Sequence, residues 1–310
     1  MYSKTAIILG CHTDSKIKVE SFKKNLNYFS ELGNTIYIVN SSEFKGEIES
    51  SLKSEHQYIL HDNLHETYEL DSNKTHIFIL YLENDNLICH GKWNYLLQSI
   101  PLNRHEGYVL TNDSFVLIGD LLEFKNLYQN NEYEMVGFID SNQIKYHYPD
   151  FLRYYTVGGI SKWLNYFNEF KHRCKLFQDM VDIMEVDSTY IFEKKNCLYK
   201  MQKNYDGNIH FDDDVCQHYI TDLGYQVIKL KKIMNTVYED KTIPHDFDGN
   251  VYRSLHHDLC FMRNLKNLEQ HFLVSGMEEG RIYKKNQKIK LPKYLDDVIE
   301  GKLSHLRKFL

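Results

Sequence analysis

The first forty residues hold two unbroken apolar runs with a segment of helical periodicity between them. Residues 5–10 and 35–39 carry no charge and are rich in β-branched side chains, as is typical of strands buried on both faces. Between these runs, large apolar side chains recur every three or four residues, at Phe22, Leu26, Phe29 and Leu32. That spacing predicts a helix, and a strand, helix and strand in this order predict a right-handed parallel crossover.

The alternation of strand and helix patterns continues along the chain. We expect strands over 58–60, 76–82, 108–111, 134–139, 151–157 and 225–230, and helices over 91–100, 119–128, 160–170 and 215–223. A hairpin is expected from 190–192 and 197–201, and Gly158 with Gly159 is expected to end the strand over 151–157 before the helix that starts at 160. From about residue 240 the pattern becomes helical, with a basic stretch over 281–293. The sequence therefore predicts an α/β fold with a helical, basic extension at its end.

Composition limits the classes of protein that this chain can belong to. At 310 residues it can form one large domain or two modest ones, and its 24 Tyr and 17 Phe can fill a core. With these aromatics the chain is not of the disordered class. A net charge of −6 argues against a dedicated nucleic-acid binder, so no nucleic-acid partner is expected.

The six cysteines lie far apart and none forms a Cys-x-x-Cys pair, so a zinc knuckle is not predicted. Three disulfides remain an alternative, but a chain of this size does not need them, and we expect free thiols in a reducing compartment. No basic region followed by a long apolar run opens the chain, and no segment is long enough to span a bilayer. These observations predict a cytoplasmic location.

Polar side chains follow the predicted strands at their carboxyl ends, where open α/β sheets bind ligands. Cys11, His12 and Thr13 follow the first strand, and Asn40 and Ser41 follow the second. Further along, Gly91 and Lys92 open a predicted helix, so an anionic ligand could lie beside its N-terminus. The simpler alternative makes Lys92 a solvated charge and its neighbour Trp93 a core anchor.

Two acids also stand at strand ends. The strand over 108–111 leads into Asn112, Asp113 and Ser114, and the strand over 134–139 leads into Asp140. A carboxylate at such a position can hold a divalent cation, which can in turn hold a diphosphate. Out of context an Asn-Asp-Ser tripeptide is most often a turn or a cap, so both interpretations stay open.

Taken in order, four blocks of this chain resemble the rhamnan synthesis F-type glycosyltransferases, which include L-rhamnosyltransferases of bacterial and large-virus polysaccharide synthesis. Residues 89–93 resemble the family's Asp-Phe-Gly-x-Trp block, and residues 110–115 its Asn-Asp-Ser strand end. Residues 137–141 with Tyr146 and His147 resemble its Gly-x-Thr-Asp-Ser block and downstream Tyr-His. Asp213 with residues 219–225 resembles its Glu and Tyr-Leu-x-x-x-Gly-Tyr helix. The resemblance covers roughly residues 5–230.

The chain departs from the family pattern at three places. Cys89 stands where the family has Asp, Ile139 where it has Thr, and Pro149 with Asp150 where it has Gln and Ser. The resemblance implies the GT-A architecture, a Rossmann-type mixed sheet flanked by helices. We expect this domain over residues 1–238 and the helical, basic extension over residues 239–310.

The resemblance also implies a reaction, the transfer of L-rhamnose or a similar deoxysugar from a UDP- or dTDP-linked donor to a glycan acceptor. Asp113, with help from Asn112 or Ser114, would hold Mn²⁺ or Mg²⁺ against the leaving diphosphate. Asp140 would be the general base of an inverting transfer, with His147 as the second candidate base or a diphosphate contact. The residues that would line the donor pocket are Cys11, His12, Thr13, Asn40, Ser41, Gly91 and Lys92.

The sequence also bears on two other classes of function, a nucleotide-dependent enzyme of another kind and a non-catalytic binding protein. A dinucleotide oxidoreductase should carry Gly-x-Gly-x-x-Gly after the first strand, and a P-loop kinase should carry Gly-Lys-Ser/Thr; neither motif is present. A non-catalytic protein that binds carbohydrate or nucleotide-sugar and derives from a transferase stays open, because of Cys89.

Three weaker patterns have simpler explanations. His61 with His65, and His256 with His257 and Asp258, have metal-ligand residue types, but their surroundings favour ordinary structural roles. The Asp run 212–214 suits a helix cap more than a site. The basic stretch over 281–293 could touch an anionic membrane surface, although a solvated loop is the simpler interpretation.

Overall fold

The chain has two compact units, Met1–Ile209 and His210–Leu310, here called the N-terminal and C-terminal units. The computed structural model describes residues 5–13, 16–41, 45–54, 57–61, 63–64, 74–83, 87–130, 132–142, 144–200, 226–230, 242–256, 259, 262, 264–277 and 281–285. The predicted boundary after residue 238 stays a prediction, because residues 231–241 lie outside this set.

The N-terminal unit is built on an eight-stranded sheet in the order β3-β4-β2-β1-β5-β8-β7-β9. Its strands are β1 (Thr5–Cys11), β2 (Thr35–Asn40), β3 (Tyr58–His61), β4 (Thr75–Tyr81), β5 (Gly107–Asn112), β7 (Met135–Ile139), β8 (Leu152–Thr156) and β9 (Lys195–Tyr199). Neighbours run parallel except where β8 lies antiparallel between β5 and β7. The predicted mixed α/β sheet flanked by helices is thus confirmed.

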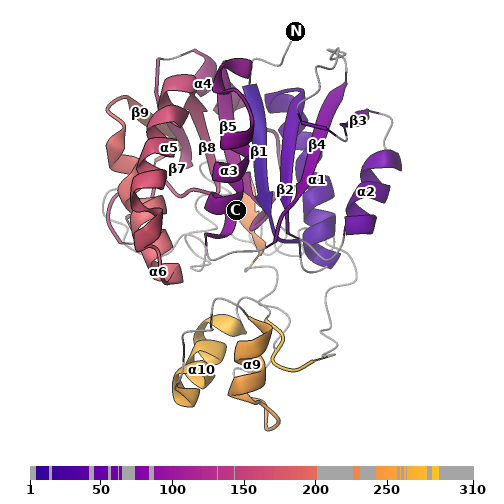
Figure 1. The fold of residues 1–310 in the computed structure, drawn as a ribbon, viewed down its shortest axis with the longest axis vertical. Helices are drawn as coiled ribbons and strands as arrows, with labels where there is room; N and C mark the ends of the chain where they lie inside the picture. Colours follow the sequence, from indigo (N-terminus) through magenta and orange to yellow (C-terminus); the bar gives the residue numbers. More distant parts are fainter. Residues whose placement is uncertain are drawn as a thin grey trace, which may run out of the picture. The chain divides into compact units, whose positions relative to one another are not determined.

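Helices cover both faces of this sheet (Figure 1). They are α1 (Lys16–Leu32), α2 (Lys45–Ser54), α3 (Ile88–Ser99), α4 (Leu122–Gln129), α5 (Val157–Phe170) and α6 (Phe177–Asp179), with shorter turns η1 (Leu102–Arg104), η2 (Lys171–Arg173), η3 (Met180–Val186) and η4 (Asp187–Ile191). The helices α3 and α5 contact each other and the central strands, and Figure 1 shows them in front of the sheet, with α1 behind it. Two covered faces explain why the strands are continuous apolar runs.

The layer formed by α3 and α5 is anchored by two tryptophans. Trp93 and Trp163 are both 1% exposed, and their ring centroids lie 6.2 Å apart in an edge-to-face arrangement. The Trp93 indole N–H donates to the carbonyl oxygen of Thr111 in β5 at 2.9 Å. A Cβ on Gly10 would lie 2.8 Å from that indole nitrogen, so this glycine in β1 lets α3 approach the sheet. These contacts confirm the prediction that Trp93 anchors the core.

Several predicted boundaries were wrong, and so was one predicted hairpin. The strand β8 does end before the glycine pair, at Thr156, but Gly158 and Gly159 lie inside α5. Thr156 caps α5 by accepting the Gly159 N–H, and a Cβ on Gly159 would clash with the Glu134 carbonyl. The helix expected from residue 119 begins at Leu122. The helix expected from residue 91 begins at Ile88. The expected hairpin is absent from this described segment, because 187–191 form η4 and β9 pairs parallel to β7.

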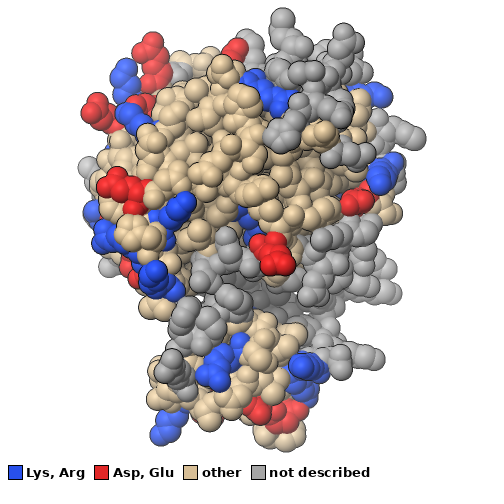
Figure 2. All heavy atoms as spheres, viewed as in Figure 1, with Lys and Arg blue, Asp and Glu red and all other residues tan. Residues whose placement is uncertain are grey.

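On the face turned toward the viewer in Figure 2, the described surface of the N-terminal unit is mostly uncharged. Its charged side chains gather toward the margins of the view. None of the helices within the described residues is both long and apolar enough to cross a membrane.

The C-terminal unit is described in part. It contains β10 (Val227–Lys229), α9 (Gly249–Leu255), α10 (Leu265–His271) and the π-helical turn η7 (Phe272–Gly276), which confirms the predicted helical character of the described region. Its core is formed by Tyr252, Leu259, Leu268, Phe272, Met277 and Tyr283. The predicted helix over 215–223 and the acids at 212–214 lie outside the described residues, as do His65, His257, Asp258 and the chain beyond 285.

Candidate active site at the carboxyl edge of the sheet

The predicted polar residues meet at one edge of the sheet, here called the carboxyl edge, where β1, β2, β5 and β7 end. Cys11 lies opposite Asn40 in the neighbouring strand, and Gly10 lies opposite Asn112 on the other side. Parallel pairing brings these strand ends into one row. The structure therefore places the residues that follow β1, β2 and β5 side by side.

Asp113 is anchored by the loop that follows β1. The backbone N–H of His12 donates to Oδ2 of Asp113 at 3.0 Å, and Lys18 Nζ lies 3.9 Å from the same oxygen. Nδ1 of His12 lies 2.9 Å from the Ser41 hydroxyl, which links this loop to the end of β2. Both of these contacts use Oδ2 of Asp113, and a carboxylate has a second oxygen that can coordinate a cation.

Asn112 and Ser114 form a local turn at the end of β5. The side-chain oxygen of Asn112 accepts from the Ser114 backbone N–H at 3.1 Å and from the Ser114 hydroxyl at 2.6 Å. This is the Asx-turn geometry that short polar side chains adopt. A cation that used Asn112 as a ligand would have to share its oxygen with this turn.

Lys92 is buried at 3% exposure, so its interpretation as a solvated charge is wrong.

Burial raises the pKa of the Cys11 thiol, as does nearby Asp113, whereas Lys92 and Lys18 lower it. Cys11 is therefore a neutral thiol at physiological pH and a poor nucleophile. Thr13 is also fully buried at this place.

Gly91 does not offer the N–H that its predicted role needs. Because α3 begins at Ile88, the Gly91 N–H already donates to the carbonyl of Leu87 at 3.1 Å. The first turn of α3 is instead formed by Ile88, Cys89 and His90. Ile88 has φ of 52°, a left-handed conformation that costs a side-chain-bearing residue roughly 1–2 kcal/mol.

Asp140 lies at the end of β7 and is 2% exposed. Its Oδ2 accepts from the Tyr146 hydroxyl at 3.0 Å, and its backbone N–H donates to the carbonyl of Tyr199 at 3.1 Å. Burial raises the pKa of the Tyr146 hydroxyl, and Asp140 raises it further, so this phenol stays protonated and can donate.

His147 follows Asp140 closely along the chain, but its side chain contacts other groups. Its Nδ1 lies 2.7 Å from the carbonyl of Lys145, and its Nε2 lies 3.8 Å from a carboxylate oxygen of Glu185. Its backbone pairs with Ser141 in both directions. Nδ1 must donate to a carbonyl, which leaves Nε2 as the nitrogen that could exchange a proton.

Asp113 and Asp140 stand on the same edge with β8 between them. Two strand spacings put their backbones about 10 Å apart. Since β8 is antiparallel, it begins where β5 and β7 end: Leu152 lies opposite Thr111, and Arg153 lies opposite Gly137. The residues just before β8 therefore enter the gap between the two acids.

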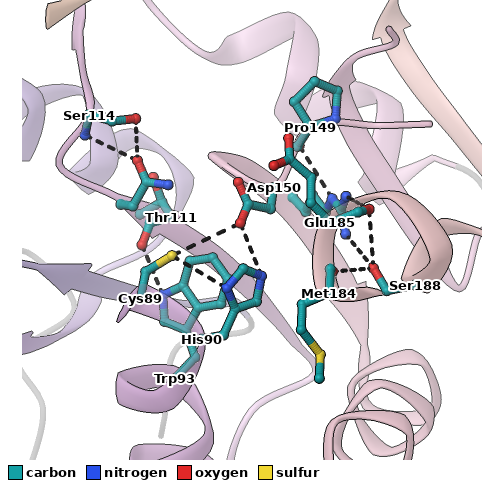
Figure 3. A network of polar contacts seen from close by, with 12 residues as sticks. Cys89, His90, Trp93, Thr111, Ser114, Pro149, Asp150, Met184, Glu185 and Ser188 are labelled. Carbon is teal, nitrogen blue, oxygen red and sulfur yellow. Dashed lines mark hydrogen bonds and ion pairs between the residues drawn. The ribbon is translucent and has the colours of Figure 1, made fainter. Parts of the chain in front are cut away.

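Asp150 occupies this gap, and sequence reasoning did not assign it to the site. Its Oδ2 lies 3.0 Å from Nε2 of His90 and 4.0 Å from Sγ of Cys89 (Figure 3). Sγ of Cys89 lies 3.7 Å from Nδ1 of His90. The available signal was a pair of departures from the family pattern, an acid lost at position 89 and an acid gained at position 150.

The cluster of Cys89, His90 and Asp150 is largely buried. Cys89 is 7% and His90 4% exposed. The His90 ring stacks against Trp163 and meets Trp93 edge to face. Burial raises the pKa of the Cys89 thiol, Asp150 raises it further, and Lys92 lowers it.

Comparison with known proteins adds little to this picture. No family model matches the chain, and no curated protein matches it. Many solved structures resemble it, and three of them serve as examples. A 4-diphosphocytidyl-2C-methyl-D-erythritol synthase from Anaerococcus prevotii has 11% identity and a TM-score of 0.41, over 68% of this chain and 94% of its own.

The second is a protein from Bacillus anthracis, provisionally assigned as a glucose-1-phosphate thymidylyltransferase, with 11% identity and a TM-score of 0.40, over 64% of this chain and 87% of its own. The third comes from Desulfovibrio desulfuricans and is provisionally assigned as a nucleotide-diphospho-sugar transferase. It has 10% identity and a TM-score of 0.39, over 73% of this chain and 93% of its own. Likenesses this weak do not bear on activity, and the architecture rests on the chain's own sheet order and register.

Proposed function

We propose that this chain is a glycosyltransferase that uses a nucleoside diphosphate sugar. The supporting observation is the row of polar residues at the ends of β2, β1 and β5, with Asp113 anchored among them and buried Lys92 close by. A leaving diphosphate needs positive charge at the reacting end. A divalent cation on Asp113, together with Lys92, would supply it.

The residues fit such a cation. Asp113 keeps a second oxygen for it, and one protein carboxylate is enough when the diphosphate and water complete the shell. Oxygen ligands favour Mn²⁺ or Mg²⁺. The cation would stabilise the charge that develops on the diphosphate, while His12 and Ser41, which contact each other, would line the neighbouring donor pocket.

Asp140 is the proposed general base for the acceptor hydroxyl. Its carboxylate already accepts one hydroxyl, from Tyr146 at 3.0 Å, which is the distance and chemistry that proton transfer needs. An acceptor hydroxyl that took the place of the Tyr146 hydroxyl would lie against Asp140. Attack from the face opposite the diphosphate would invert the anomeric carbon, and His147 is the second candidate base.

The finer identity of the reaction rests on the four blocks that resemble the rhamnan synthesis F-type family. They support L-rhamnose or a similar deoxysugar, a UDP- or dTDP-linked donor and a glycan acceptor, in the cytoplasm of the producing cell. The second candidate function is a binding protein without catalysis. It is favoured by the Lys18 contact, because Lys18 already partly neutralises Asp113.

The test is a thermal-shift screen of UDP-, dTDP- and GDP-sugars with and without Mn²⁺. A donor that binds the folded chain raises its melting temperature by mass action. We expect a Mn²⁺-dependent shift that Asp113→Ala abolishes and that Asp182→Ala, on a separate turn, retains. A shift of equal size in Asp113→Ala would contradict the proposal, and slow donor hydrolysis would separate an enzyme from a binding protein.

A further inference from the structure

We propose that Cys89, His90 and Asp150 bind one transition-metal ion of the zinc type, at a position separate from Asp113. Their ligand atoms, one thiol sulfur, one imidazole nitrogen and one carboxylate oxygen, all lie within 4.8 Å of one another. Among the described residues this is the one group of at least three potential metal ligands.

The spacing of the donors suits a tetrahedral ion. Bond lengths of about 2.0–2.3 Å to sulfur, nitrogen and oxygen place the donor atoms roughly 3.4–3.6 Å apart in a tetrahedron. The separations measured from Asp150 Oδ2 are 3.0 Å to the His90 nitrogen and 4.0 Å to the Cys89 sulfur. Both lie within a few tenths of an ångström of that range, so small side-chain rotations complete the geometry.

The imidazole of His90 supplies an independent observation. Its Nε2 is buried and makes no hydrogen bond of standard geometry, although it lies 3.0 Å from the Asp150 carboxylate. A buried nitrogen without a hydrogen bond costs free energy unless something satisfies it. A metal ion shared with Asp150 and Cys89 would satisfy the lone pair of this nitrogen.

The donor set selects the kind of metal. Thiolate and imidazole ligands suit Zn²⁺ and similar ions, whereas Mg²⁺ and Ca²⁺ take oxygen ligands. As the sulfur–metal bond forms, the thiol proton leaves to solvent. One thiolate and one carboxylate then balance a divalent charge, so the loaded site is neutral.

The surroundings hold these ligands in place. The Arg153 guanidinium, 1% exposed, donates to the carbonyls of Tyr148 and Pro149 immediately before Asp150, and to that of Glu185. Trp93 and Trp163 fix the His90 ring. Groups that orient ligands in this way commonly change metal affinity about 10–100-fold when they are lost.

Three protein ligands leave a fourth tetrahedral position for water or for an oxygen of a bound molecule. The Asp150 side chain is 14% exposed, so the ion can enter from its side. The metal site itself does not depend on the proposed transfer.

The experiment is a titration of the purified chain with Co²⁺ alone, followed by absorbance, and then displacement by Zn²⁺. We expect one equivalent of Co²⁺ to give a thiolate-to-cobalt charge-transfer band and the visible bands of a tetrahedral ion. Cys89→Ser should abolish the charge-transfer band, and Asp150→Asn should weaken binding about tenfold or more. Cys174→Ser, which removes another buried thiol, should change neither.

Two outcomes would overturn the proposal: no Co²⁺ band in the wild-type chain, or a band that persists in Cys89→Ser. Asp113→Ala should keep the band, because an ion held by oxygen ligands at Asp113 would give none. If Cys89→Ser does not fold, Asp150→Asn decides the question, since an unchanged affinity in that variant contradicts the site.

Discussion

The half of the carboxyl edge formed by β2, β1 and β5 differs from the half formed by β8 and β7 in how its functional groups arrive. In the first half, each group follows a parallel strand, and loops hold it through contacts such as His12 to Asp113 at 3.0 Å. In the second half, Asp150 precedes an antiparallel strand and meets a helix start. A mixed sheet thus brings the beginning of one strand to the edge where its neighbours end.

The two halves also differ in how their charges are held. Asp113 is 13% exposed and close to Lys18, whereas Asp140 is 2% exposed and hydrogen-bonded to a tyrosine. A partly exposed carboxylate beside a lysine suits an exchangeable metal and diphosphate. A buried carboxylate held by a phenol suits proton transfer at a fixed position. We therefore expect donor binding to depend on the first half and transfer on the second.

The largest expected effect is a loss of sugar transfer without a loss of donor binding, when the second half of the edge is altered. Asp140→Asn should lower the transfer rate by about 10²–10⁴-fold, the usual contribution of a general base, while the donor-induced thermal shift stays as in wild type. Asp182→Asn is the matched control and should transfer normally. Transfer by Asp140→Asn at near wild-type rate would show that the second half does not supply the base.

The next effect concerns stability. Arg153→Met should destabilise the fold, because each buried carbonyl or hydroxyl left unpaired costs roughly 1–3 kcal/mol. Arg153 donates to five such acceptors, on Tyr148, Pro149, Tyr155, Glu185 and Ser188. Denaturant unfolding measures the loss. Arg173→Met, at an exposed position, should change the free energy of unfolding little. Equal stability of the two variants would mean that the second half does not need this clamp.

The smallest effect is a dependence on alkaline pH. Burial raises the pKa of Tyr199 from 10.0 to about 12, as do Glu123 and Asp120. Because the folded pKa exceeds the unfolded one, the stability contributed by the neutral phenol is complete below pH 10 and is lost as the pH rises toward 12. Melting temperatures across this window should fall less steeply in Tyr199→Phe than in Tyr95→Phe, which alters an exposed tyrosine. Identical slopes of melting temperature against pH in the two variants would contradict the raised pKa of Tyr199.

Much of the first half could be predicted from the sequence. Apolar runs such as 5–10 and 35–39 mark strands covered on both faces, and polar residues after a parallel strand must lie at the carboxyl edge. Four described cysteines, Cys11, Cys89, Cys174 and Cys197, are free thiols, as expected. His61 lies in β3 with its Nε2 2.8 Å from Nδ1 of His76, so it is part of the sheet.

In the second half, Asp140 at the end of β7 could be predicted from the sequence, but the place of Asp150 could not, for physical reasons. The direction of β8 depends on its pairing with β5 and β7, which no local pattern records. The position of Cys89 and His90 depends on where α3 begins, and helix starts are set by tertiary packing as much as by capping residues: Leu87 caps α3 without a side-chain hydrogen bond. The place of Asp150 in the site therefore became visible only in the folded structure.

The central claim is that Asp113 holds a divalent cation against the diphosphate of a nucleotide-sugar. Phosphorus NMR of the bound donor tests it, because Mn²⁺ broadens the resonances of phosphates that it coordinates. The account predicts strong broadening by Mn²⁺ with wild type and Asp140→Asn, and none with Asp113→Ala at a donor concentration that still saturates it. Equal broadening with Asp113→Ala would contradict it.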